Sequence, residues 1–128
     1  MSGRCLADTN VIIRLLRSDE HSVELFDNAE EIYIPAIVAG ELFYGAHNSA
    51  RKQENLDIFN DFLSQYEIAE ISVGVAVAYG EIKAQLKRDG FSIPENDIWI
   101  AAIAKCHNYI LLTFDNHFKR IEGLNVLS

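Results

Sequence analysis

The sequence predicts an α/β protein with a central parallel sheet, because short apolar runs alternate with longer amphipathic segments along its 128 residues. Strands separated by helices need crossover connections, which join parallel neighbours. Hydrophobic residues make up 49% of the chain, enough for a sizeable core, and charged residues make up 23%, an ordinary level for a folded protein. We therefore expect one ordered domain over residues 1–128.

Short apolar runs bounded by polar residues have the length and composition of strands. The first run contains Cys5, Leu6 and Ala7 and stops at Asp8. We predict strands at residues 4–7, 31–34, 67–71 and 109–113, with an edge strand at 125–126.

The segments between these runs have helical periodicity and recognisable helix ends. Asp8 or its neighbour can cap the first helix. Pro35 and Pro94 stand at helix N-termini, where proline is tolerated, and the Asp89-Gly90 pair is typical of a helix C-terminus. We predict helices at residues 9–17, 20–29, 35–47, 51–65, 73–88, 94–107 and 117–121.

Three of these helices have a special character. The segment 94–107 is apolar nearly all round, which predicts a buried helix with Trp99 in the core. The helices at 35–47 and 51–65 are together longer than one crossover needs. We expect them to form a projecting helical pair.

The formal net charge of −8 argues against broad nucleic-acid binding through a basic surface. It does not exclude a nuclease whose acidic site is neutralised by bound cations. Basic residues on two helices, Arg14 with Arg17 and Lys83 with Lys87 and Arg88, fit either a solvated face or contacts with an RNA backbone.

Two features concern the compartment. Cys5 and Cys106 lie in apolar surroundings, which predicts buried free thiols in a reducing cytosol. No run approaches the roughly 20 apolar residues of a membrane span. The first residues also lack the apolar region of a secretory signal, so we expect a cytoplasmic protein with no membrane contact.

Four acidic residues stand where the predicted elements change, at Asp8, Glu41, Asp97 and Asp115. In an open parallel sheet, ligands bind beside the carboxyl ends of the strands. Four carboxylates there would form a site of hard oxygen ligands, which Mg²⁺ or Mn²⁺ prefers. This pattern predicts metal-dependent chemistry on phosphate esters. Mutual repulsion should raise at least one of the four pKa values in the metal-free protein.

Each acid also has an ordinary structural interpretation. Asp8 and Asp97 can act as helix caps, and Asp115 can form a turn with Asn116. Glu41 is harder to explain in this way, because it interrupts an apolar run on a helix that should pack inward. The histidines, by contrast, show no metal-ligand spacing and are expected at helix ends or on the surface (His47, His107 and His117).

Four segments carry these acids in a fixed order: LADTNVI at 6–12, GELFYGA at 40–46, NDIWIAA at 96–102 and LTFDNHF at 112–118. They resemble the motifs of PIN-domain ribonucleases, and more narrowly those of VapC-type toxins from VapBC toxin–antitoxin systems. The resemblance implies a PIN-like three-layer α/β/α fold and a Mg²⁺- or Mn²⁺-dependent endoribonuclease. It implies catalytic and metal-binding roles for Asp8, Glu41, Asp97 and Asp115, and softer supporting roles for Thr9, Asn10, Asn96 and Thr113.

Within that resemblance we assign roles in order. Asp8 and Asp97 are the first metal ligands. Glu41 either binds metal or orients the nucleophilic water. Asp115 either binds through water or completes a second metal site. A divalent metal would supply both a reactive water and charge stabilisation on the phosphate.

The resemblance also implies partners. These are an RNA substrate and a small antitoxin whose tail inserts into the acidic groove. Operator DNA would be bound only through the antitoxin. A homodimer is expected through the helices between residues 35 and 65, with Phe43, Phe59 and Phe62 as apolar contacts.

Three other functions compete with this interpretation. A receiver domain of two-component signalling would need an acidic pair after the first strand, whereas Thr9 follows Asp8 here. A DNA- or flap-cutting nuclease on the same fold usually carries insertions that this chain has no room for. A non-catalytic module that receives a basic peptide in its acidic groove remains the main alternative.

Overall fold

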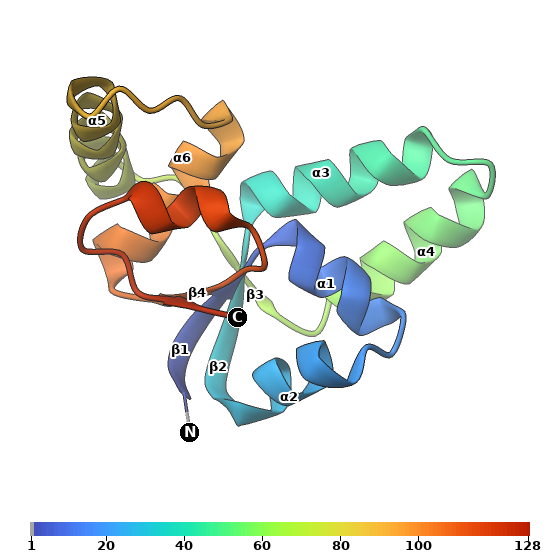
Figure 1. Cartoon of the computed structure of the whole chain (residues 1–128). Helices are drawn as coiled ribbons and strands as arrows, with labels where there is room; N and C mark the ends of the chain where they lie inside the picture. Colours follow the sequence, from blue (N-terminus) through green and yellow to red (C-terminus); the bar gives the residue numbers. More distant parts are fainter. Residues whose placement is uncertain (1) are drawn as a thin grey trace.

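The strands form one parallel sheet at the centre of the molecule (Figure 1). The computed structural model describes residues 2–128. The strands, in spatial order, are β3 (Glu67–Ala69), β2 (Ala29–Pro35), β1 (Ser2–Ala7), β4 (Ile110–Leu112) and β5 (Val126–Leu127), and every neighbouring pair is parallel. This confirms the predicted fold class, although the third strand ends two residues before the expected Ile71.

The chain reverses its direction of travel across the sheet between β1 and β4. It first moves outward from β1 to β2 and β3, then returns past β1 to β4 and β5. Right-handed crossovers therefore place the helices that follow β1 and β2 on one face and those that follow β3 on the other. The switch point between β1 and β4 is where an open α/β sheet leaves a crevice for ligands.

The helices cover both faces of the sheet (Figure 1). They are α1 (Thr9–Leu16), α2 (Glu20–Asn28), α3 (Ala36–His47), α4 (Lys52–Leu63), α5 (Val73–Arg88) and α6 (Glu95–His107), with a short 3-10 helix η1 (Asn116–Arg120) after β4. Asp8, Asp19 and Ser72 accept backbone N–H groups at the starts of α1, α2 and α5, which satisfies donors that a helix leaves open.

Helix α6 supplies much of the core, as its composition predicted. Ile100 and Ile103 are fully buried, and so are Leu111 and Leu112 in β4. Burial of one such side chain contributes about 1.5–3 kcal/mol. Trp99 is only partly buried at the margin of this core, where its ring stacks on Tyr79 with 3.9 Å between centroids.

Helices α3 and α4 lie side by side and project from the body as an arm (Figure 1), as expected. The arm corrects one detail of the expected dimer contact. Phe62 is 5% exposed and packs inside the same chain against Phe26 and Tyr66, so it is not available to a second copy. Tyr44, in contrast, is 71% exposed on α3.

The two cysteines differ, which corrects the expectation that both are buried. Cys5 is buried in β1, and burial raises the pKa of its thiol to about 11. Cys106 is exposed, because it lies in the last turn of α6 beyond the buried stretch that ends at Ala104. Throughout residues 2–128, none of the helices combines the length and apolar content that crossing a membrane requires.

Candidate active site

Asp8 is the buried centre of the site, at the carboxyl end of β1. Its backbone N–H continues the β1–β4 ladder by donating to the Leu112 carbonyl. Its side chain is 5% exposed and accepts three hydrogen bonds, from the Thr9 backbone N–H (2.8 Å), from Asn10 Nδ2 (3.2 Å) and from Thr113 Oγ1 (2.8 Å). The predicted helix cap and the predicted site residue are therefore the same carboxylate.

Thr113 and Asn10 connect Asp8 to the segment after β4. The Thr113 hydroxyl accepts from Asn10 Nδ2 (3.3 Å) and from the Asp115 backbone N–H (3.0 Å). The Asn10 Oδ1 atom accepts from the Phe114 backbone N–H (3.0 Å). These contacts fix the chain that carries Asp115 beside Asp8.

Glu41 approaches the same place from α3. Its Oε1 accepts from Thr9 Oγ1 at 3.2 Å, and the side chain is partly exposed rather than buried. Its predicted inward position is therefore only half correct, because one side of the carboxylate faces a cavity lined by Thr9 and Asn96.

Asp97 and Asp115 meet at one histidine. Asp97 lies in the first turn of α6, and Asp115 caps η1 by accepting the His117 backbone N–H at 3.0 Å. The Nδ1 atom of His117 lies 3.3 Å from Asp97 Oδ2 and 3.1 Å from Asp115 Oδ1. Ligand atoms from all three residues fall within 4.8 Å of one another.

The electrostatics confirm the predicted direction of the pKa shifts but not the leading cause. Burial is the main reason that the pKa values of Asp8, Glu41 and Asp97 are raised. Repulsion from neighbouring carboxylates adds to it: Asp97 and Asp115 act on Asp8, and Asp8 and Asp97 act on Glu41. Hydrogen bonds from Thr113, Thr9 and His117 oppose these shifts.

The same group of side chains fits a divalent cation. Carboxylate oxygens with an imidazole nitrogen are ligands that Mn²⁺ and other first-row metals accept, and carboxylates alone suit Mg²⁺. A cation would also remove the repulsion among the acids. Asp97, Asp115 and His117 are the residues whose ligand atoms lie close enough together to hold one ion.

A groove leads away from the acids between α1 and the arm. It encloses about 450 Å³. Its apolar lining comes from Ile13 and Leu16 on α1 and from Ile58 and Phe59 on α4, and Glu41 stands in its wall. The shape offers an apolar binding surface that ends beside a carboxylate.

The comparisons with known proteins agree with this geometry. The sequence pattern of the PIN domain matches residues 5–124. Ribonuclease VapC2 of Haemophilus influenzae is 33% identical to this chain, over 93% of the chain and 92% of its own length. The chain is a PIN-domain protein of the VapC family.

One further relative and one solved structure support the assignment of the chain to this family. The tRNA(fMet)-specific endonuclease VapC of Salmonella typhimurium is 31% identical over 94% of both proteins. A chain in the crystal structure of DNA-bound VapBC from the same organism matches with a TM-score of 0.89 and 30% identity, over 97% of this chain and 96% of that one. The predicted PIN-like fold is confirmed.

Of the four acids that the sequence singled out in this PIN domain, Asp97 and Asp115 have oxygens within 4.8 Å of each other and of His117. Asp8 and Glu41 lie near enough to interact with them electrostatically but are not members of that close group. Of the softer supporting positions, Thr9, Asn10 and Thr113 hydrogen-bond to the acids. Asn96 is exposed and lines the cavity beside Glu41.

His117 is the residue that sequence reasoning missed. It was expected only at a helix end or on the surface, and it is 47% exposed, yet its ring joins two of the acids. Its position two residues after Asp115, at the start of a short helix, was the one available signal. This position points to the acidic site only once α6 is known to pack beside η1.

Proposed function

We propose that this PIN domain is a Mg²⁺- or Mn²⁺-dependent endoribonuclease and the toxin of a type II toxin–antitoxin pair. The observation that carries the proposal is the convergence of Asp8, Glu41, Asp97 and Asp115 at the switch point of the sheet. Relatives named as ribonucleases and as a tRNA endonuclease support RNA as the substrate. We further propose that it acts in the cytoplasm, on the RNA there.

In this proposal Asp97 and Asp115 would present partly exposed oxygens to the cation and Asp8 a fixed one, while Glu41 would orient the attacking water. When bound, the cation supplies positive charge for the phosphate oxygens and makes water a stronger nucleophile near neutral pH. The network around Asp8 keeps its carboxylate in one orientation, so little reorganisation accompanies the reaction.

Glu41 is the acid best placed to take a proton. Its Oε1 is engaged by Thr9, which leaves Oε2 to accept the proton of an attacking water. Burial raises the pKa of Glu41 toward the working pH, and a general base is most effective when these two values are close.

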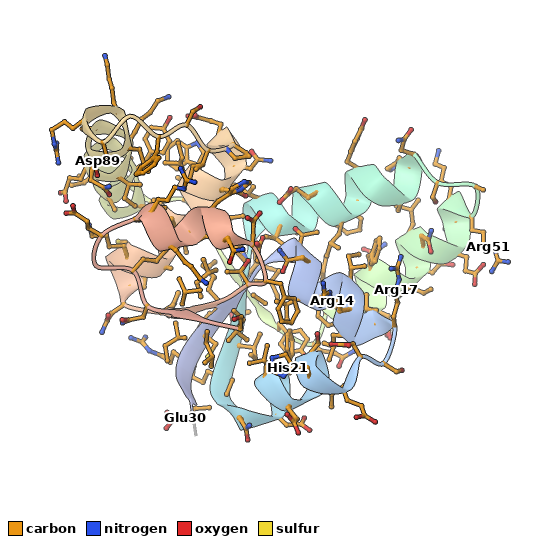
Figure 2. The ribbon with its side chains drawn as sticks, viewed as in Figure 1. Arg14, Arg17, His21, Glu30, Arg51 and Asp89 are labelled. Atoms are coloured by element: carbon orange, nitrogen blue, oxygen red, sulfur yellow. The ribbon has the colours of Figure 1, made fainter. Side chains whose placement is uncertain are left out.

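Arg14 is the basic residue best placed to contact the RNA backbone. Its guanidinium lies 4.4 Å from the centroid of the Phe114 ring, next to Asp115 in the sequence, and Arg17 follows as the C-cap residue of α1 (Figure 2). Lys83 on α5 is instead paired with Glu95 at 3.2 Å. We assign phosphate contact to the two arginines, because guanidinium groups match phosphate geometry.

We propose that the antitoxin occupies the groove between α1 and the arm and reaches the acids past Glu41. The apolar lining suits an amphipathic segment, and the related VapBC structure is a complex bound to DNA. Operator DNA would then contact the antitoxin rather than this acidic chain. A homodimer through the arm would use the exposed Tyr44 and the half-buried Phe43, because Phe59 lines the groove assigned to the antitoxin.

The test is cleavage of total cellular RNA by purified, antitoxin-free protein with Mg²⁺, with Mn²⁺ or with EDTA. We expect discrete fragments that require the cation. Asp97→Asn should reduce cleavage by about 100-fold or more, whereas Asp61→Asn, an exposed acid on α4, should leave it unchanged.

Cleavage that survives Asp97→Asn would contradict the assigned site. A folded protein that binds cations but cleaves no RNA would favour the alternative of a non-catalytic acidic-groove module. Size measurement by light scattering in the same preparation tests the dimer, with Tyr44→Asp expected to shift the mass toward one chain.

A further inference from the structure

The Nδ1 atom of His117 lies from one oxygen of Asp97 and one oxygen of Asp115 at the spacing of neighbouring ligands around one metal ion. Ligands about 2.1 Å from an octahedral cation lie roughly 3.0 Å from each other along an edge. The His117 Nδ1 atom lies 3.1 Å from Asp115 Oδ1 and 3.3 Å from Asp97 Oδ2. The nitrogen therefore stands where a third ligand would stand.

His117 is held in this position from two sides. The side chain of Asp115 accepts its backbone N–H, which fixes the first turn of η1. The next residue, Phe118, is fully buried and anchors η1 in the core. Asp97 approaches the same Nδ1 atom from α6. The three side chains would therefore need no large rearrangement to bind one ion together.

The side chain also has the exposure that an exchangeable cation needs. His117 is 47% exposed, Asp115 31% and Asp97 15%, so water can reach the ion and fill the remaining positions. With its ring proton on Nε2, the imidazole presents a lone pair at Nδ1. Imidazole adds affinity for first-row transition metals that carboxylates alone do not provide.

We propose that His117 is a direct ligand of the cation, together with Asp97 and Asp115, and that it makes the site select Mn²⁺ over Mg²⁺. This inference rests on the proposed cation-dependent function and narrows it to one metal class. The competing role for His117 is a charged partner that only neutralises the two carboxylates, with no bond to metal.

The test uses the full chain and Mn²⁺ as the probe. Pulsed electron paramagnetic resonance on the Mn²⁺-bound protein detects a coordinated ¹⁴N nucleus directly, without any variant. Calorimetric titrations with Mn²⁺ and with Mg²⁺ then compare the wild-type protein with His117→Ala. The matched control is His47→Ala, an exposed histidine at the end of the arm helix α3.

We expect a nitrogen coupling in the wild-type and His47→Ala proteins and its loss in His117→Ala. The Mn²⁺ affinity of His117→Ala should fall by about tenfold or more, while its Mg²⁺ affinity changes by less than about threefold. The result that overturns the inference is Mn²⁺ bound by the wild type, lost in Asp97→Asn, and free of nitrogen coupling. Absence of Mn²⁺ and Mg²⁺ binding to the wild type would overturn the proposed function as well, so the two failures are distinguishable.

Discussion

The two halves of the acidic site are built differently. The closed half, formed by Asp8, Asn10 and Thr113, is buried or half-buried and joined by direct hydrogen bonds. The open half, formed by Glu41, Asp97, Asp115 and His117, is partly exposed and has fewer partners. The difference teaches that one half fixes the geometry of the site and the other leaves oxygens accessible to a ligand.

The largest effect should be a loss of stability in Thr113→Val, for which Thr9→Val is the matched comparison. Thr113→Val removes a buried hydroxyl that donates to Asp8 and accepts from Asn10 and the Asp115 N–H. We expect it to lower the free energy of unfolding by about 2–3 kcal/mol, because buried partners lose their hydrogen bonds. Thr9→Val removes one bond to the partly exposed Glu41 and should cost about 1 kcal/mol or less.

Urea unfolding of the metal-free proteins measures both values. Equal losses for Thr113→Val and Thr9→Val would remove the distinction between the closed and open halves.

An effect of intermediate size is expected on the pH dependence of cation affinity. The pKa values of Asp8, Glu41 and Asp97 are raised, mainly by burial, so protons compete with the cation at higher pH than at ordinary carboxylates. Mn²⁺ affinity should fall on the order of tenfold between pH 7 and pH 5. Calorimetry at both pH values measures it, and binding should release protons into the buffer. An affinity that does not change over this range would contradict the assignment of these acids to the cation site.

The smallest effect is on the stability of the metal-free protein. Because the pKa of Asp97 is raised in the folded state, that state holds the proton more tightly than the unfolded chain does. Stability is therefore lost as pH rises from the ordinary carboxyl range through the raised value. Asp97→Asn should raise the melting temperature at pH 7 by about 2–4 °C, with the difference disappearing near pH 3.

Asp61→Asn on the exposed face of α4 is the control for this experiment and should change the melting temperature little. Saturating Mn²⁺ should reverse the order of wild type and Asp97→Asn, because the cation stabilises only the protein that binds it. A wild-type protein more stable than Asp97→Asn without metal at pH 7 would mean that the charged Asp97 side chain stabilises the fold, opposite to the expected effect.

The closed half was largely predictable from sequence. Asp8 and Thr113 end apolar strands, and the ends of parallel strands meet at one edge of a sheet. The four acids could be predicted as site residues from that rule together with the resemblance to PIN-domain ribonucleases. The hydrogen bonds that fix Asp8 could be anticipated only as soft supporting positions, because they depend on the register of β1 against β4.

The open half and the arm were less predictable, because they depend on how helices pack. His117 contacts Asp97 only because η1 lies against α6. Phe62 faces Phe26 rather than a partner, and Cys106 lies two residues beyond the buried part of α6. The type of each of these residues could be read from the sequence. The sequence did not show which neighbour each side chain would contact.

The hydrogen bond between Thr113 and Asp8 joins residues 105 positions apart. During synthesis, the segment that carries β1 leaves the ribosome long before β4 exists, and until then Asp8 has no strand beside it on that edge. The unfinished chain thus carries three of the four acids without the scaffold that orients them. For a protein whose proposed target is the RNA of its own cell, activity would begin only after synthesis of the chain that carries it is almost complete.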